Sequence, residues 1–126
     1  MKRIAKFEKV SLVQFAEGWT DTFGEVSQEE IKKIYDEIHL PKRATSGSAG
    51  YDFFAPAAFT LAPGETVKIP TGVRVWMEPE WVLKCYPRSG LGFKFRLQLN
   101  NTVGIIDSDY YDSDNDRSYY ISYLNE

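Results

Sequence analysis

Hydrophobic residues follow a helical period only in the first third of the chain. Ile31, Ile34, Tyr35 and Ile38 are spaced i, i+3, i+4 and i+7, so they share one face of a helix. The stretch Ser27–Glu30 before them has the capping-box pattern. An earlier capping box, Ser11-Leu12-Val13-Gln14, precedes three further apolar positions: Phe15, Ala16 and Trp19. The pattern predicts two helices.

The boundaries of these helices are marked by residues that interrupt helical structure. Gly24 lies between the two segments and predicts a break, and Pro41 ends the second helix. Ahead of the first helix, the alternation from Lys2 to Val10 predicts a strand with Ile4 and Phe7 facing inward.

After Pro41 the period changes to short β-rich runs separated by turn residues. We expect strands at seven runs: Tyr51–Phe54, Thr66–Ile69, Val73–Met77, Trp81–Tyr86, Leu97–Leu99, Val103–Ile106 and Ser118–Leu124. Many short strands with regular turns are typical of a sandwich, a barrel or a jelly roll. The sequence therefore predicts a mainly β fold with a helical N-terminal extension.

Composition narrows the classes of function. The chain has 126 residues, of which 43% are hydrophobic and 26% charged, as in one globular domain. The net charge of −3 argues against a nucleic-acid groove, and no apolar run is long enough for a membrane span. One cysteine and one histidine exclude an internal disulfide framework and a two-histidine zinc site. Catalysis would therefore fall to carboxylates, arginines or backbone amides.

Three segments could carry that chemistry. In the first, Ala44–Phe53, small residues lead into a run that carries Asp52, which fits either a site or a turn stabilised by its Asp. In the second, Tyr86–Gly92, two glycines could form an anion-binding nest beside Arg88 and Ser89. An ordinary surface turn with one Arg would have the same sequence.

The third segment, Asn101–Tyr110, is an apolar strand that ends in Asp107. A carboxylate at a strand end can be held rigidly and take a proton from water. Tyr110 could stack on a base or a sugar ring. The alternative is a strand that leaves the core through an acidic turn. Cys85, in an apolar run, is expected to be a buried small hydrophobe.

Together and in this order the segments resemble the first three motifs of the trimeric dUTPases. The resemblance rests on Ala49–Asp52, Pro87–Leu91 and Gly104–Tyr110, and it extends from about Leu40 to Asn115. It implies a dUTPase-like β jelly roll that forms a homotrimer with active sites at the subunit interfaces. Residues 1–126 would be a single domain, with a strand and helical extension over 1–40 and the jelly-roll core over 41–126.

The resemblance also implies the reaction and its residues. The reaction would be hydrolysis of dUTP to dUMP and pyrophosphate, which keeps uracil out of DNA and supplies dUMP for thymidylate synthesis, with Mg²⁺ carried by the triphosphate. Asp107 would be the catalytic base. Asp52 would act on the metal through waters. The substrate-binding residues would be Arg88, Ser89, Gly90, Asn101, Gly104, Ile106 and Tyr110.

Two departures from the family pattern are visible. The family commonly has Arg-Gly after the Tyr of its third motif, and this chain has Tyr111-Asp112 followed by an acidic loop to Asp116. The fourth and fifth family motifs do not occur before Glu126, so the core is expected to be C-terminally incomplete. The alternatives are a truncated or catalytically impaired module that binds nucleotide or a protein partner, and a dCTP deaminase. The expected partners exclude nucleic acid and membranes, and the expected location is the cytoplasm of a bacterial or phage-infected cell.

Overall fold

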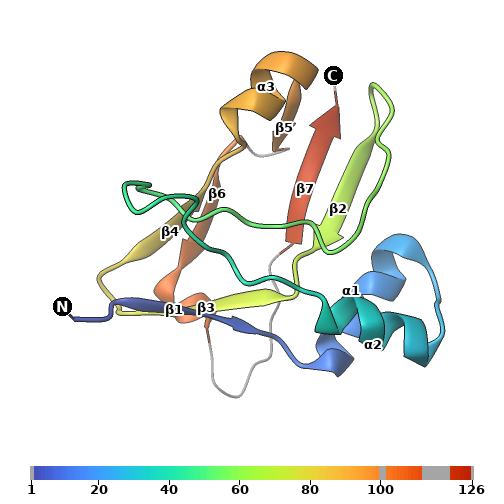
Figure 1. Ribbon diagram of the computed structural model, residues 1–126, viewed down its shortest axis with the longest axis horizontal. Helices are drawn as coiled ribbons and strands as arrows, with labels where there is room; N and C mark the ends of the chain where they lie inside the picture. The colour runs from blue at the N-terminus through green and yellow to red at the C-terminus, as the bar shows by residue number, and fades with distance from the viewer. Residues whose placement is uncertain (1, 100–101, 112–119, 126) are drawn as a thin grey trace.

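The computed structural model describes residues 2–99, 102–111 and 120–125, and it describes no side chains at 92, 93, 95 or 120–125. In chain order the elements are β1 (Ala5–Lys9), α1 (Leu12–Phe23), α2 (Gln28–Asp36), β2 (Thr66–Pro70), β3 (Val73–Met77), β4 (Val82–Cys85), α3 (Ser89–Phe95), β5 (Leu97–Leu99), β6 (Gly104–Asp107), the short 3₁₀ helix η1 (Ser108–Tyr110) and β7 (Tyr120–Asn125). The mainly β fold with a helical N-terminal segment is confirmed (Figure 1).

The strands form three small antiparallel sheets. β1 pairs with β3, β7 lies between β2 and β5, and β4 pairs with β6. In Figure 1, β4 and β6 lead from the level of the β1–β3 pair to the level of α3. The β4–β6 sheet therefore connects two ends of the molecule, which matters for the site described below.

The two predicted helices begin where their capping boxes begin. The hydroxyl groups of Ser11 and Ser27 accept hydrogen bonds of 3.1 Å from the backbone N–H groups of Gln14 and Glu30. Gly24 ends α1 with a φ of 86°, in the left-handed region that glycine adopts without strain. The break between the helices is thus encoded locally, as the sequence predicted.

A buried cluster joins the helices to the β strands. Its members come from the residue after β1, from both helices, from the segment after α2 and from β3: Val10, Phe15, Trp19, Ile31, Ile38 and Val73. Phe15 and Val10 are almost completely inaccessible to solvent. The helical segment is therefore packed into the same core as the β strands.

Gly72, at the turn between β2 and β3, makes this docking possible. Its φ is 71°, and a Cβ at this position would lie 2.7 Å from Ile38 Cδ1 and 3.1 Å from the ring of Phe15. The carbonyl of Gly72 also accepts a 3.0 Å hydrogen bond from Val10 N–H. The turn fits under the helices because Gly72 has no side chain.

Two local expectations differ from the structure. Residues 51–54 form no strand, and only Asp52 makes an isolated bridge, to Lys42. The β-rich composition of that run reflects packing, because Tyr51 and Phe53 contact Phe7 with ring centroids 5.5 and 5.7 Å apart. In β1, Ala5 rather than Ile4 shares the inward face with Phe7, as the two-residue period of a strand requires.

Candidate functional site

A cavity of about 740 Å³ lies between the connection that precedes β2 and the strand β4. Residues 48–53 line one side, and residues 83–88 line the other. Phe7 of β1 and Leu99 of β5 are also in its wall. The cavity brings together the first two of the three segments that the sequence singled out.

Asp52 and Arg88 meet at this cavity. Arg88 Nη1 lies 3.7 Å from Asp52 Oδ2, and the Arg88 side chain is 73% exposed whereas that of Asp52 is 31% exposed. An exposed pair of this kind contributes at most about 1 kcal/mol. The Asp52 backbone is fixed by two hydrogen bonds to Lys42, of 2.8 and 3.3 Å. The arrangement is therefore a carboxylate on a fixed backbone beside an exposed guanidinium.

Ser89 and Gly90 lie in the first turn of α3, and Leu91 N–H donates a 3.1 Å hydrogen bond to the carbonyl of Arg88. The expected nest is not formed at Gly90, because its φ is not positive. The two glycines of the segment made a helix hard to predict, since each disfavours a helix interior by about 1 kcal/mol relative to Ala. The backbone N–H groups here are those of a short helical turn.

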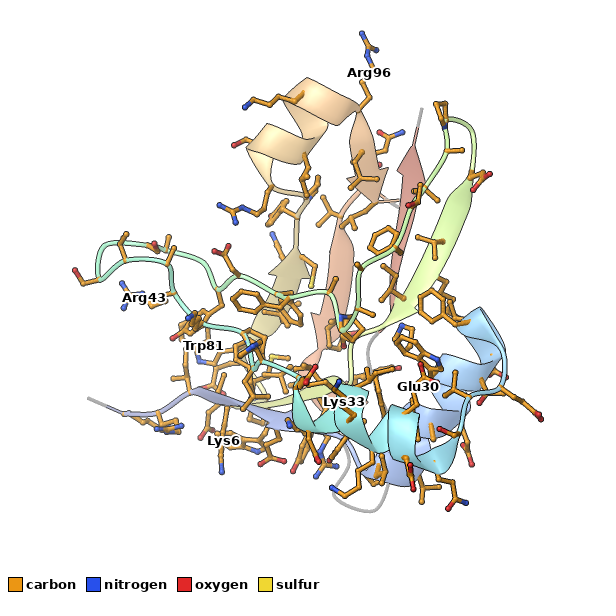
Figure 2. The ribbon with its side chains drawn as sticks, turned by 45° about the vertical axis from the view of Figure 1, so that its right-hand side comes forward. Lys6, Glu30, Lys33, Arg43, Trp81 and Arg96 are labelled. Carbon is orange, nitrogen blue, oxygen red and sulfur yellow. The ribbon has the colours of Figure 1, made fainter. Side chains whose placement is uncertain are left out.

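The first wall of the cavity is shaped by Arg43, a residue that the sequence did not single out. Its Nε donates a 2.8 Å hydrogen bond to the carbonyl of Ser48, and its Nη2 donates to the carbonyl of Ser46. Ser48 Oγ also accepts a 3.1 Å bond from Thr45 N–H. Figure 2 shows Arg43 in the projecting loop formed by residues 43–50. The only sequence signal was an Arg directly before a run of small residues.

Asp107 lies away from this cavity. In the β4–β6 register it is paired with Val82, while Gly104 is paired with Cys85. Its side chain is exposed and makes no capping hydrogen bond to η1. The neighbouring Ser108 Oγ donates a 3.3 Å bond to the carbonyl of Pro79, which anchors the start of η1. Asp107 is thus an accessible carboxylate on an anchored backbone, as predicted for a strand end.

Two other predicted site residues of the third segment have packing contacts inside the chain. Ile106 and Tyr110 pack, partly buried, against Val75 and Met77 of β3. Asn101 lies outside the described residues.

Gly104 faces Cys85 closely across the β4–β6 pair, because a Cβ on it would be 3.2 Å from Cys85 Cβ. Burial raises the pKa of the Cys85 thiol. The thiol therefore stays protonated, which fits the expected small hydrophobe, although the residue is only half-buried and lines the cavity.

The structure therefore separates the predicted residues into two groups. The ladder from Val82 to Cys85 spans about 10 Å, and Arg88 lies three residues beyond its end. Asp52 and Arg88 are at one end of the β4–β6 sheet, and Asp107 and Tyr110 are at the other. One chain does not bring the predicted base to the predicted phosphate-binding residues.

The donor set for a metal is small. Across residues 2–99, 102–111 and 120–125, no three His, Cys, Asp or Glu side chains gather into a metal-binding group. Mg²⁺ usually keeps several waters and binds through one or two carboxylates together with substrate phosphates. Asp52, a single carboxylate beside the Arg88 guanidinium, fits a Mg²⁺ ion that arrives with a triphosphate better than a resident ion.

None of the helices in the described part of the chain has the length and apolar character needed to cross a membrane.

Comparison with known proteins gives one family. A family model described as dUTPase matches residues 36–113. The deoxyuridine 5′-triphosphate nucleotidohydrolase of Actinobacillus pleuropneumoniae serotype 5b is 49% identical over 81 residues, which cover 62% of this chain and 54% of the relative. That of Methylobacillus flagellatus is 46% identical over 86 residues, which cover 64% and 57%. The chain thus spans about half the length of these curated relatives.

Solved structures agree with this match. A dUTPase from Streptococcus mutans is 40% identical with a TM-score of 0.59, over 68% of each chain. A mutant dUTPase from phage phi11 of S. aureus is 21% identical with a TM-score of 0.66, over 98% of this chain and 60% of that one. The second likeness concerns the fold alone, and at 98% coverage it includes the helical segment. The predicted dUTPase-like β fold is confirmed.

Proposed function

Because the chain belongs to the dUTPase family, we propose that it acts in the hydrolysis of dUTP to dUMP and pyrophosphate. The reaction keeps uracil out of DNA and supplies dUMP for thymidylate synthesis. Its setting would be the cytoplasm of a bacterial or phage-infected cell, where deoxynucleotides are used. Residues 1–126 would act as one domain.

The observation that supports this proposal is the presence of two separate half-sites at the ends of one sheet. Arg88 beside Asp52 suits a charged phosphate chain, since guanidinium groups bind phosphate with paired donors. Asp107 suits the activation of a water, because it is an exposed carboxylate on an anchored backbone. A reaction at a phosphate needs both functions.

Each half-site then has a defined task. Asp107 accepts a proton from the water that attacks the α-phosphorus, and the bond from that phosphorus to the pyrophosphate oxygen breaks. Arg88, the hydroxyl group of Ser89 and the backbone N–H groups of Ser89 and Gly90 stabilise the charge that builds on the phosphates. Asp52 faces the same phosphates, and a Mg²⁺ ion bound with them would supply further charge neutralisation.

The third segment would recognise the nucleoside. Tyr110 would lie under the deoxyribose and leave no room for a 2′-hydroxyl group. Asn101, Gly104 and Ile106 would contribute backbone groups that read the uracil edge. Tyr110 is held for this task by its packing on Val75 and Met77.

We propose further that the half-sites are completed by other copies of the chain in a homotrimer. The outward face of the β4–β6 sheet supports this, because it carries exposed apolar side chains. Val82 is 45% exposed, Ile105 is 61% exposed and Tyr86 is 63% exposed. Burying such a face against a second copy would remove apolar surface from water and bring Asp107 of one copy toward Arg88 of another.

Pyrophosphate release from dUTP in the presence of Mg²⁺ is the direct test. We expect the chain to produce dUMP and pyrophosphate in equal amounts, with dUTP preferred over UTP and dCTP. Ammonia released from dCTP would instead identify a deaminase. Binding of dUMP with no pyrophosphate release would instead favour a nucleotide-binding module.

A further inference from the structure

The segment that carries Asp107 and Tyr110 is tied to the N-terminal strand by three side chains. Tyr111 OH donates a 3.2 Å hydrogen bond to Glu8 Oε2. Arg74 Nη2 lies 3.2 Å from the same Glu8 oxygen. The Arg74 guanidinium carbon lies 4.7 Å from the centroid of the Tyr111 ring. We call Glu8, Arg74 and Tyr111 the tyrosine anchor.

Each member of the tyrosine anchor depends on the other two. Glu8 and Arg74 are direct neighbours in the β1–β3 register, and their side chains are only 27% and 19% exposed. Arg74 Nε is buried and has no hydrogen-bond partner among the described residues. The guanidinium charge is therefore balanced mainly by the Glu8 carboxylate and by the face of the Tyr111 ring. Removing one partner leaves a half-buried charge poorly compensated.

The tyrosine anchor also gives a role to each of the two consecutive tyrosines at the end of the 3₁₀ helix η1, whose last residue is Tyr110 and whose C-cap is Tyr111. Tyr110 packs on Val75 and Met77, and Tyr111 stacks on Arg74. Because alternate residues of a strand face opposite sides, the two rings contact residues from opposite faces of β3. In Figure 1 this chain segment follows β6 down to the β1–β3 pair. The backbone at Tyr110 and Tyr111 is thereby fixed from both sides of one strand.

We propose that Glu8, Arg74 and Tyr111 are positioning residues that set the orientation of the Asp107–Tyr110 segment and so control selection of the deoxyribose. Tyr111 occupies the position where the family commonly has Arg. This chain therefore has at that position an aromatic ring, which contacts the Arg74 guanidinium, in place of a cationic side chain. The inference rests on the proposed nucleotide site. Without the tyrosine anchor, the backbone that follows Tyr110 would lose its contacts with Glu8 and Arg74, and Tyr110 would exclude a 2′-hydroxyl less well.

Tyr111→Phe tests this, because it keeps the ring over Arg74 and removes only the hydroxyl bond to Glu8. Two quantities are measured on the full chain: the amide hydrogen exchange of residues 107–111, and the ratio of the dissociation constants of UMP and dUMP. We expect exchange to become at least tenfold faster and the UMP/dUMP ratio to fall at least fivefold. Glu8→Ala removes the acceptor together with the ion pair to Arg74 and the longer, more exposed one to Lys6, and it should change both quantities more.

Tyr35→Phe is the matched control. It also removes one hydroxyl hydrogen bond, of 2.6 Å to the carbonyl of Val10, but it does so under the helices. It should leave the exchange of residues 107–111 and the UMP/dUMP ratio within twofold of the wild type. A similar change in both variants would mean a general loss of stability and would overturn the positioning role.

Two further outcomes are decisive. Unchanged exchange in both Tyr111→Phe and Glu8→Ala, or faster exchange with an unchanged UMP/dUMP ratio, would overturn the inference. Both readouts are independent of turnover. A wild-type chain that binds dUMP selectively but releases no pyrophosphate would therefore refute the hydrolase function and leave the tyrosine anchor to be judged on its own measurements.

Discussion

Asp107 is the residue on which the proposed chemistry depends most. Its side chain is exposed, and the backbone that carries it is held by the register with Val82 and by the bond from Ser108 to Pro79. Because no capping bond uses its carboxylate, that group is free to meet a water. The exposed side chain therefore contributes little to the stability of the fold.

Asp107→Asn should abolish pyrophosphate release while it leaves the fold and dUMP affinity nearly unchanged. The amide has the size of the carboxylate, but it cannot take a proton from water. Calorimetric titration with dUMP and the pyrophosphate assay together check this. A loss of dUMP affinity beyond about tenfold (~1.4 kcal/mol) would contradict the role of base.

Cys85 gives a second prediction at this scale, based on burial. Its thiol pKa is raised because the half-buried side chain loses solvation of the thiolate. Alkylation by iodoacetamide should therefore rise with pH later than that of the same chain unfolded in urea. The unfolded chain loses this proton at a lower pH, so the group's contribution to stability should fall as the medium becomes alkaline. Identical pH profiles for the folded and the unfolded chain would disprove this.

The formation of helices α1 and α2 is determined by local sequence, but their position in the fold depends on residues far along the chain. Their capping serines and apolar spacing are visible in the sequence, and both helices begin where predicted. Their docking depends on Gly72, which lies in a turn between two strands far along the chain. No pattern in residues 1–40 indicates that contact.

Gly72→Ala should destabilise the chain by about 2–4 kcal/mol. The added methyl group would meet Ile38 and Phe15, and the positive φ would be strained for alanine. Gly64→Ala is the matched control, because its φ of 83° is similar and nothing lies within 4 Å of its Cβ. Urea unfolding followed by tryptophan fluorescence should show the larger loss at Gly72. Equal losses at both glycines would mean that strain alone, without the docking contact, accounts for the effect.

The helix α3, in contrast to α1 and α2, forms against the local preference of its sequence. Its two glycines favoured a nest, yet the structure has a short helix over Ser89–Phe95. Tertiary contacts outweigh a local preference of about 1 kcal/mol per glycine. The strand β5 contacts this helix and supplies such contacts. The sequence singled out the segment Tyr86–Gly92 but did not predict its helical conformation.

At the scale of the whole molecule, the exposed apolar face of the β4–β6 sheet is the proposed interface of the homotrimer. Ile105→Asp should shift the chain from trimer to monomer, because it would place a charge in the proposed interface. Val13→Asp is the control, since Val13 is 69% exposed in the first turn of α1, where an acidic residue is favourable. Sedimentation velocity distinguishes the two assemblies. A wild-type chain that sediments as a monomer would refute the trimer.

The sequence by itself determined most of the elements, the three motifs and the family resemblance, because capping boxes, hydrophobic periods and motif residues are local properties. The helix α3 and the absence of a strand at residues 51–54 are the exceptions. The sequence could not determine where the motifs lie relative to one another. The antiparallel register of β4 with β6 decided that Asp107 and Arg88 lie at opposite ends of one sheet. The contact of Tyr111 with Glu8 joins residues 103 positions apart. Such pairings arise from the packing of the whole chain, which no local period records.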